Sequence, residues 1–412
     1  MIGDAARKLH SMDNSSKRLC MKTVLAVCIL VTLVGFLVVG YWCPQGVCVS
    51  PRPLPRTRTR VKHVASDSMG EPLSFLSHPL HAGSQFRSRL SFDDMLRDDF
   101  EFDMKGSDVM VFLHIQKTGG TVFGRHLVRD LDLQKPCECE KGRKRCKCFR
   151  PDSDGKLWLF SRYSTGWKCG LHADWTELTS CVDAAMDRTE KTSAKRRYFY
   201  ITLLREPVAR FLSEFRHVQR GATWKGARHW CGGRSATSQE LPPCYTSEDW
   251  SDVTLQEFVS CNSNLAVNRQ TRMLADLSLV GCYNRSALPA HERDLLLLAS
   301  AQENLRRMAF FGLCEQQRKS QYVFERTFRL RFLRPFTQIN ELHSSAAIGA
   351  MSPQDVERIR RLNYLDVQLY EYAKGLMEER YKRIRERDPS FESEDFDAQL
   401  NEEDAYTLPP FR

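Results

Sequence analysis

The chain has 412 residues and a formal net charge of +10 at pH 7. This length is sufficient for one large folded domain with appendages. The positive charge favours a polyanionic partner, although a modest excess also serves general solubility. The cysteines, discussed below, indicate that the protein lies in the secretory lumen. Nucleic acid is excluded as a partner in that compartment, and the natural polyanions there are sulfated or uronic-acid glycans.

A stretch near the amino terminus is long and apolar enough to cross a membrane. Residues 23–42 are almost wholly apolar and carry no charge. A cleaved signal peptide is the alternative, but no small-residue cleavage site follows the apolar core. Basic residues lie on both sides of the stretch, so the charge rule alone leaves its orientation open. We expect residues 1–22 to form a cytosolic tail and residues 23–42 a transmembrane signal anchor.

The cysteines indicate on which side of the membrane the folded part lies. There are 15, and eleven of them lie between Cys137 and Cys314. This density in a domain of enzyme size suits an oxidising lumen, where the sequon at Asn284 is usable. We predict a single-pass type II protein with its bulk in the lumen, comprising a stem (43–101), a folded domain (102–385) and an acidic, disordered tail (386–412).

The first sequence motif with chemical content begins in an apolar run. Val109–Leu113 predicts a buried strand of the parallel type. A turn with Gly119 and Gly120 follows, and then a helix-compatible segment, 122–131. Such a turn brings free N–H groups at the helix start close to an anion, and Lys117 adds a full charge. It is not a Walker A loop because the lysine precedes the glycines, which disfavours a nucleotide kinase. The alternative is an ordinary turn with a surface lysine.

A second strand and helix have the same organisation. Tyr198–Leu204 predicts another buried strand, and Pro207 suits the first turn of the following helix. Arg205 then lies at the carboxyl end of a strand, where ligands bind in open α/β sheets. Ser213 lies about two helical turns further on the same side. This arginine and hydroxyl could hold a second phosphate.

The remaining elements are predicted from apolar periodicity. We expect mostly helix over 255–279, a strand over 308–313, a helix over 317–328 and an irregular segment over 336–350. Ser352 and Pro353 begin one long amphipathic helix whose apolar face contains Val356, Ile359, Leu362, Leu369, Tyr372 and Leu376. Strands that alternate with helices predict an α/β fold with a central parallel sheet flanked by helices.

Two of these motifs resemble loops of a known enzyme class. Residues 114–121 and 204–213 resemble the 5′-phosphosulfate and 3′-phosphate loops of Golgi sulfotransferases, and 158–175 and 216–225 resemble the heparan-sulfate 6-O-sulfotransferases specifically. The resemblance covers about residues 102–385 and implies a P-loop-NTPase-like sulfotransferase fold. It implies transfer of a sulfuryl group from 3′-phosphoadenosine 5′-phosphosulfate to the 6-hydroxyl of glucosamine residues in heparan sulfate, at the Golgi membrane and without a metal.

The resemblance also assigns residues to the donor and the acceptor. The donor would be bound by His114, Ile115, Gln116, Lys117, Thr118, Gly119, Gly120, Thr121, Arg205 and Ser213, with late contacts from Thr337, Gln338, Ile339, His343 and Ser344. The acceptor groove would be basic and aromatic, because sugar rings stack on flat side chains and carboxylates pair with cations. Its residues would be Lys144, Arg145, Arg162, Trp167, His172, His217 and Trp224, with Arg220, Lys225 and Arg228 as extensions. For Lys144 and Arg145 the alternative is a solvated charge run.

Sulfuryl transfer needs two catalytic functions. The leaving phosphate must be neutralised, for which Lys117 is suited, and the acceptor hydroxyl must lose its proton. A histidine is the usual base, and the resemblance implies His172, which Asp174 could orient. The alternatives are that His172 only packs on tryptophan in the core, or that His114 is the base.

The cysteines between 137 and 148 form two Cys-x-Cys pairs that could suggest zinc. A lumenal site favours disulfides instead, and they would pin the hairpin that carries Lys144 and Arg145. We further expect Cys169 to pair with Cys181 and Cys231 with Cys244. Because eleven is odd, one cysteine should stay outside these disulfides, and we expect this to be Cys314.

Two other functions fit parts of the sequence. A uronyl 2-O-sulfotransferase would have similar donor loops and would differ only in the acceptor segments. A non-catalytic heparan-binding Golgi protein could keep the fold and lose the chemistry. The joint presence of Lys117, Arg205, Ser213 and His172 argues against this second alternative.

Overall fold

The computed structural model describes residues 92–97, 100–153, 155–336, 348–349 and 351–388. Contacts divide the chain into two units, 1–77 and 78–412, and every described residue belongs to the second. The predicted anchor, most of the stem, the late donor contacts from Thr337 to Ser344 and the acidic tail after Asp388 lie outside the described residues. Within them, no helix combines the length and the apolarity needed to cross a membrane.

The core of the described unit is a parallel sheet with the strand order β4-β1-β5-β8. The strands are β1 (Asp108–Leu113), β4 (Leu159–Phe160), β5 (Arg197–Leu204) and β8 (Phe310–Leu313). In the register of the two central strands, Asp108 lies opposite Arg197 and Leu113 opposite Thr202. Every residue of β1 is buried, as its apolar run requires of a strand covered on both faces. The predicted strands at 109–113, 198–204 and 308–313 are thus confirmed. The third of them, β8, is two residues shorter than predicted.

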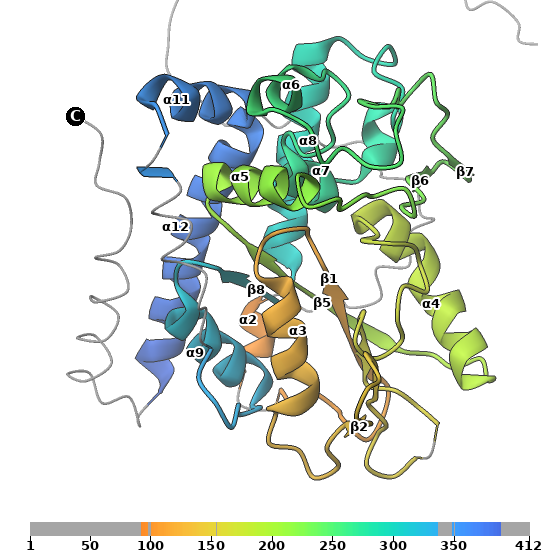
Figure 1. The fold of residues 1–412 in the computed structure, drawn as a ribbon. Helices are drawn as coiled ribbons and strands as arrows, with labels where there is room; N and C mark the ends of the chain where they lie inside the picture. Colours follow the sequence, from red (N-terminus) through yellow and green to blue (C-terminus); the bar gives the residue numbers. More distant parts are fainter. Residues whose placement is uncertain (1–91, 98–99, 154, 337–347, 350, 389–412) are drawn as a thin grey trace, which may run out of the picture. The chain divides into compact units, whose positions relative to one another are not determined.

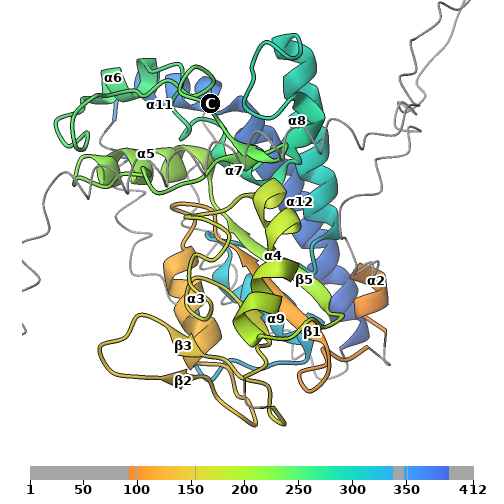
Figure 2. The same ribbon diagram turned by 90° about the vertical axis from the view of Figure 1, so that its right-hand side faces the viewer.

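Helices cover both faces of this sheet (Figures 1 and 2). On one face, Phe310 of β8 contacts Phe123 of α3 (Gly120–Arg129) and Phe324 of α9 (Gln317–Phe328), with ring centroids 6.0 and 5.2 Å apart. On the other face, Tyr200 of β5 contacts Trp175 of α4 (Trp175–Glu190) at 5.0 Å. The arginine Arg380 of α12 (Tyr364–Arg387) lies 5.0 Å from the Phe311 ring on that same face. The predicted α/β fold with a central parallel sheet is confirmed.

A second apolar cluster lies beyond the carboxyl ends of the strands (Figure 1). It is formed mainly by α5 (Pro207–Val218), α6 (Leu255–Ser260) and α11 (Pro353–Leu362). Phe211 of α5 packs on Phe258 of α6 with centroids 5.1 Å apart. Other helical elements in the described part of the chain are α2 (Phe92–Met95), α7 (Arg269–Leu274), η1 (Leu277–Val280) and α8 (Ala290–Arg307). This cluster supports α5, the helix that follows Arg205.

One predicted helix is interrupted, so this prediction was wrong in extent. The predicted single helix after Pro353 is broken between α11 and α12 at Asn363, whose side chain donates to the carbonyl of Ile359 over 2.9 Å. Short amide side chains compete with the backbone for helical hydrogen bonds, and the prediction neglected this competition. The segment 255–279 is mostly helical, as predicted, because it contains α6, α7 and nearly all of η1.

The packed core also begins earlier in the chain than Phe102. Phe92 and Met95 of α2 and the following Phe100 are buried in the main core cluster. Phe100 contacts Phe199 of β5, with ring centroids 6.0 Å apart. These three side chains lie in the range predicted as stem, so part of that range contributes to the core of the described unit.

Five disulfides join ten of the eleven described cysteines. Cys137–Cys148 and Cys139–Cys146 pin the hairpin of β2 (Glu138–Cys139) and β3 (Cys146–Lys147), and Cys169 pairs with Cys181. The expected pair Cys231–Cys244 is wrong. The hairpin of β6 (Trp230–Cys231) and β7 (Arg234–Ser235) instead presents Cys231 to Cys282, and Cys244 pairs with Cys261. Such pairings depend on how loops fold together, which sequence spacing does not reveal. Cys314 is a buried thiol outside these disulfides, as expected.

Candidate active site

A cleft of about 880 Å³ opens at the carboxyl ends of β1 and β5. This is the edge at which open α/β sheets bind ligands. The cleft brings together most of the predicted donor and acceptor residues from three separate segments of the chain. Those that line it are His114, Gln116, Lys117, Gly119, Gly120, Thr121, Arg162, Trp167, His172, Arg205, Ser213, His217, Arg220 and Trp224.

The loop between β1 and α3 has the backbone of an anion site. Gly119 precedes α3 with φ of 81°, a left-handed conformation that favours glycine. A side chain at Gly120 would collide with the His114 ring, because its Cβ would lie 2.5 Å from a ring carbon. The Thr118 hydroxyl donates to the Ile115 carbonyl over 3.1 Å. Thr118 and Ile115 are buried and do not line the cleft, so their side chains shape the loop, whose N–H groups at the start of α3 are available to a ligand.

Cations from several elements converge on this loop. Arg205 donates from its guanidinium to the Lys117 carbonyl over 3.1 Å. The pKa of Lys117 is lowered first by burial and then by the positive charges of Arg220 and Arg205. Such mutual repulsion is relieved when an anion binds between the cations. The cleft is therefore built to accept negative charge.

His172 is held in the tautomer that can act as a base. Its Nδ1 lies 2.8 Å from the carbonyl oxygen of His114, which can only accept, so Nδ1 carries the proton. The other ring nitrogen, Nε2, is then unprotonated. The ring packs on Trp167 and Trp224, with centroids 4.5 and 5.4 Å away. These contacts fix the plane of the imidazole within the cleft.

The electrostatic surroundings keep His172 neutral. Burial is the main cause that lowers its pKa to about 4, and the charges of Arg269 and Arg162 act in the same direction. The hydrogen bond to the His114 carbonyl opposes these effects only in part. At neutral pH the imidazole is therefore in its basic form.

Asp174, named as a possible orienting group, and His114, the alternative base, have different surroundings. The Asp174 carboxylate caps α4, accepting from the backbone N–H of Glu177, and it accepts from the Tyr283 hydroxyl over 3.1 Å. Asp174 could have oriented the His172 ring, but the His114 carbonyl does so instead. The His114 ring is buried and stacks on Phe112, and burial holds its pKa well below the ordinary value. His114 thus forms part of the floor beneath the donor loop.

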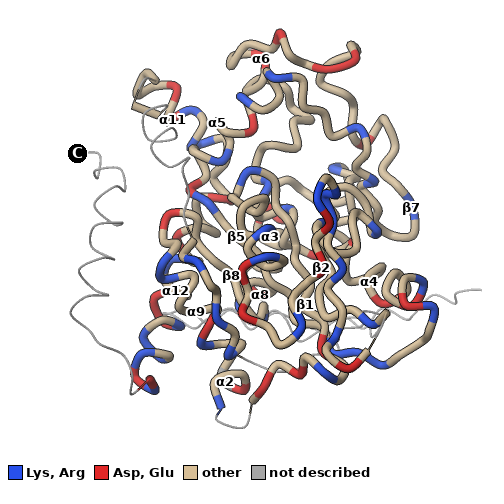
Figure 3. The backbone as a smooth tube through the Cα atoms, turned by 60° about the horizontal axis from the view of Figure 1, so that its bottom comes forward, with Lys and Arg blue, Asp and Glu red and all other residues tan. Residues whose placement is uncertain are grey.

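The wall of the cleft that faces the donor loop is aromatic and basic. The Arg162 guanidinium lies 5.3 Å from the Trp167 ring, and His217 packs on Trp224 with centroids 5.7 Å apart. Lys144 and Arg145 are exposed at the tip of the disulfide-pinned hairpin and do not line the cleft. The Arg145 guanidinium nevertheless lies against Gly166, next to Trp167, so it adjoins this wall. Figure 3 shows the cations of the hairpin in blue beside the β2 label.

Sequence reasoning missed several residues of this site. Arg125 and Arg216 also line the cleft. Helical spacing could have revealed both, because Arg125 follows Thr121 by four positions and Arg216 follows Ser213 by three. A larger omission is a buried group of charges behind the cleft, in which Glu214 accepts from the Trp224 indole over 3.0 Å.

Comparison with known proteins identifies the family. The family model described as "Sulfotransferase family" matches residues 100–373. The chain is 58% identical over 303 residues to heparan-sulfate 6-O-sulfotransferase 3-B of Danio rerio, covering 73% of this chain and 71% of that protein. It is 60% identical over 294 residues to heparan-sulfate 6-O-sulfotransferase 1 of Homo sapiens (71% of each chain) and 50% identical over 369 residues to heparan-sulfate 6-O-sulfotransferase 2 of Gallus gallus (89% and 88%). With a sulfotransferase domain and relatives this similar over most of their length, the chain belongs to the heparan-sulfate 6-O-sulfotransferase family of enzymes.

Proposed function

We propose that this protein transfers the sulfuryl group of 3′-phosphoadenosine 5′-phosphosulfate to the 6-hydroxyl of glucosamine residues in heparan sulfate. The observation that carries the proposal is the meeting, in one cationic cleft, of an anion-binding loop and an imidazole whose Nε2 is unprotonated. The first supplies the site for the phosphosulfate, and the second supplies the base for a sugar hydroxyl.

The donor is bound by the two loops that follow β1 and β5. The 5′-phosphosulfate lies on the N–H groups at the start of α3 beside Lys117, and the 3′-phosphate is bound by Arg205 and Ser213. Both loops line the same cleft, which supports this division. Thr337, Gln338, Ile339, His343 and Ser344 remain predicted donor contacts outside the described residues.

The reaction is an in-line displacement at sulfur. Nε2 of His172 takes the proton of the 6-hydroxyl as its oxygen attacks the sulfur atom. The bond between sulfur and the bridging oxygen of the 5′-phosphate breaks, and the electron pair leaves with 3′-phosphoadenosine 5′-phosphate. Lys117 and the backbone N–H groups match the negative charge that develops on the leaving phosphate. The products are the 6-O-sulfated sugar, the nucleotide and a proton on His172.

The acceptor lies along the aromatic wall. Sugar rings stack on Trp167 and Trp224, and Arg162 pairs with carboxylate or sulfate groups of the polymer. We also propose that the enzyme works in the Golgi lumen, anchored by residues 23–42. The five disulfides support an oxidising compartment.

The decisive experiment identifies the sulfated position. Purified full-length protein is incubated with donor labelled in the sulfuryl group and with desulfated heparan, and the disaccharides of the product are analysed. Label on the 6-position of glucosamine is the expected result. Label on the 2-position of the uronic acid would support the uronyl alternative, and absence of label would support the non-catalytic one.

The hairpin charges are expected to contribute to acceptor binding. Lys144→Ala with Arg145→Ala should weaken heparan binding roughly 2- to 30-fold at low salt, because two exposed ion pairs are lost. The salt dependence should also flatten, since exposed charges are screened, while donor binding persists. The matched control is Arg306→Ala with Arg307→Ala, an exposed pair on α8 outside the cleft. Titrations of heparan at several salt concentrations test this, and unchanged affinity and slope would mean that the hairpin charges are merely solvated.

A further inference from the structure

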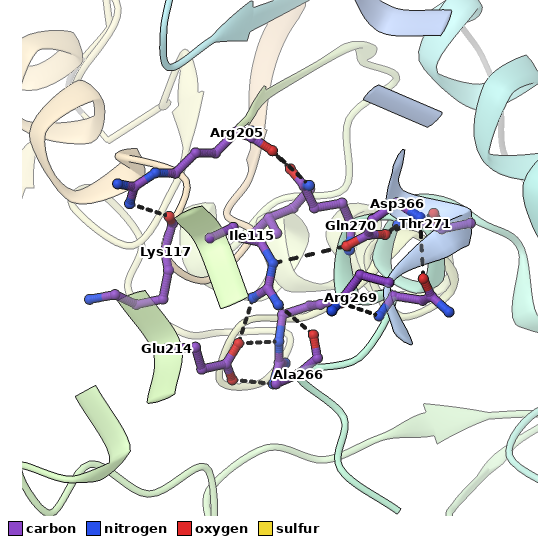
Figure 4. A network of polar contacts seen from close by, with 12 residues as sticks. Ile115, Lys117, Arg205, Glu214, Ala266, Arg269, Gln270, Thr271 and Asp366 are labelled. Carbon is purple, nitrogen blue, oxygen red and sulfur yellow. Dashed lines mark hydrogen bonds and ion pairs between the residues drawn. The ribbon is translucent and has the colours of Figure 1, made fainter. Parts of the chain in front are cut away.

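The amino-terminal turn of α7 lies behind the cleft and does not line it. Its residues Arg269, Gln270 and Thr271 are 2%, 1% and 0% exposed. Figure 4 shows polar contacts running from this turn towards Lys117 and Glu214. Buried polar side chains are retained where each group finds a partner, so the partners of these residues indicate what the turn does.

Gln270 contacts the donor side of the cleft. Its amide oxygen accepts from the backbone N–H of Arg205 over 2.9 Å, and its amide nitrogen donates to the carbonyl of the same residue over 2.9 Å. One side chain thus satisfies both backbone groups of Arg205, just beyond the end of β5. The Arg205 guanidinium in turn donates to the Lys117 carbonyl. Arg205 therefore links the position of the donor loop to Gln270.

Arg269 contacts the acceptor side. Its guanidinium bonds both oxygens of the Glu214 carboxylate, with Nε 2.9 Å from Oε2. The Oε1 atom also accepts from the Trp224 indole over 3.0 Å. The guanidinium lies 5.9 Å from the centre of the Trp224 ring, and this ring packs on His172. The orientation of the aromatic wall therefore depends on Glu214, which Arg269 holds together with Arg210 of the same helix as Glu214.

The turn itself is held from a third element. The Asp366 carboxylate of α12 accepts from the backbone N–H groups of Gln270 and Thr271 over 3.1 and 2.8 Å, and from the Thr271 hydroxyl over 2.8 Å. This carboxylate caps α7 from another helix and complements the positive end of its dipole. Two adjacent residues on a fixed turn thus contact the two different walls of the cleft.

We infer that the first turn of α7 is a positioning element that aligns the two walls of the active site, Gln270 for the donor through Arg205 and Arg269 for the acceptor through Glu214 and Trp224. The inference rests on the proposed function. Neither residue is catalytic, because neither lines the cleft. A fixed turn holds the sulfur and the attacking hydroxyl in line, and small errors in that alignment slow the reaction.

Two variants should each raise the KM for a different substrate. Gln270→Met keeps the volume but leaves both backbone groups of Arg205 without their partner, so the KM for donor should rise on the order of tenfold. The KM for heparan should stay within about twofold, because the Trp224 side is untouched. Arg269→Lys keeps the buried charge but cannot bond both carboxylate oxygens. It should raise the KM for heparan by a similar factor, about tenfold, and leave the KM for donor within about twofold.

The matched control is Thr271→Val in the same turn. It removes the hydroxyl that bonds Asp366 but touches neither wall, so it should lower the melting temperature without changing either KM. If Gln270→Met does not fold, Gln270→Glu replaces it, since this variant keeps the acceptor for the Arg205 N–H and places a carboxylate oxygen, a second acceptor, against the Arg205 carbonyl. Calorimetric binding of 3′-phosphoadenosine 5′-phosphate and of heparan to each variant provides a readout independent of turnover.

A rise in the KM for donor alone in Gln270→Met, together with a rise in the KM for heparan alone in Arg269→Lys, would support the inference. A parallel rise of both KM values in both variants, or no change in either, would overturn it, because general loosening does not distinguish the substrates. Failure of the proposed function has a separate signature, namely an unmutated enzyme that transfers no sulfuryl group. In that case the two binding measurements still decide whether Gln270 and Arg269 act on different walls.

Discussion

Replacing His172 by alanine is expected to slow sulfuryl transfer by about 100- to 10,000-fold, because the acceptor hydroxyl loses its general base. The fold and the affinities for donor and heparan should persist, since the imidazole is needed only for proton abstraction. Because His172 has φ of 51°, His172→Asn is the better-matched variant, as asparagine tolerates this backbone conformation and cannot act as the base. Single-turnover rates with both substrates bound measure the chemical step directly.

In the pH–rate profile, the rise in rate on the acidic side should occur at a lower pH than for an ordinary histidine. Since burial lowers the pKa of His172 to about 4, the rate at low donor concentration should rise as pH increases through about 4 and then level off. Bound donor adds negative charge beside the ring, which favours the imidazolium, so the limb in kcat should lie at a higher pH. Both limbs should vanish in His172→Asn. Rates measured from pH 3.5 to 8 at low and saturating donor test this.

His114 provides the decisive comparison for this assignment. His114→Ala should weaken donor binding, because its ring lies under Gly120 in the donor loop, but it should keep the pH limb. His291→Ala, an exposed position on α8, should change nothing. If His114→Ala abolishes the rate and the limb while His172→Ala keeps them, the two roles are reversed. If both variants stay active, the hydroxyl is activated in another way.

The sequence predicts best those features that are encoded locally. The apolar run of β1 and the glycines after it determine a strand, a turn and a helix start within some twenty residues, so the donor loop is recognisable without a structure. The same holds for β5 and α5, where Pro207 marks the first helical turn. The hairpin disulfides are also local, because the bridged cysteines are only 7 and 11 positions apart.

Features that depend on distant segments could not be predicted in this way. The carbonyl that orients His172 belongs to His114, 58 positions away, and it replaces the nearby Asp174 as the orienting group. Cys231 pairs with Cys282 at a separation of 51, although Cys244 is nearer in sequence. No apolar periodicity or motif reports such contacts, because they arise only when the loops pack on the finished sheet.

Replacing Lys117 by alanine is expected to lower turnover by about 100-fold or more, because one preorganised charge at the leaving phosphate is lost. Its carbonyl, which accepts from Arg205, remains in the variant, so the loop keeps that contact. The binding of heparan should change little. Lys117 itself has φ of 68°, a conformation that strains alanine, so Lys117→Asn provides a second variant that tolerates it.

The charge of Lys117, and not general surface charge, should account for this loss. Lys105→Ala is the matched control, because this exposed lysine lies before β1, at the opposite end of that strand from the cleft. It removes the same charge from the protein and should leave kcat unchanged. The main loss in the Lys117 variants should appear in kcat. The negative charge on the phosphate grows as the bond to sulfur breaks, so the lysine binds the transition state better than the ground state. Kinetics at saturating donor and heparan separate the two effects, and normal turnover in both Lys117 variants would exclude this loop as the donor site.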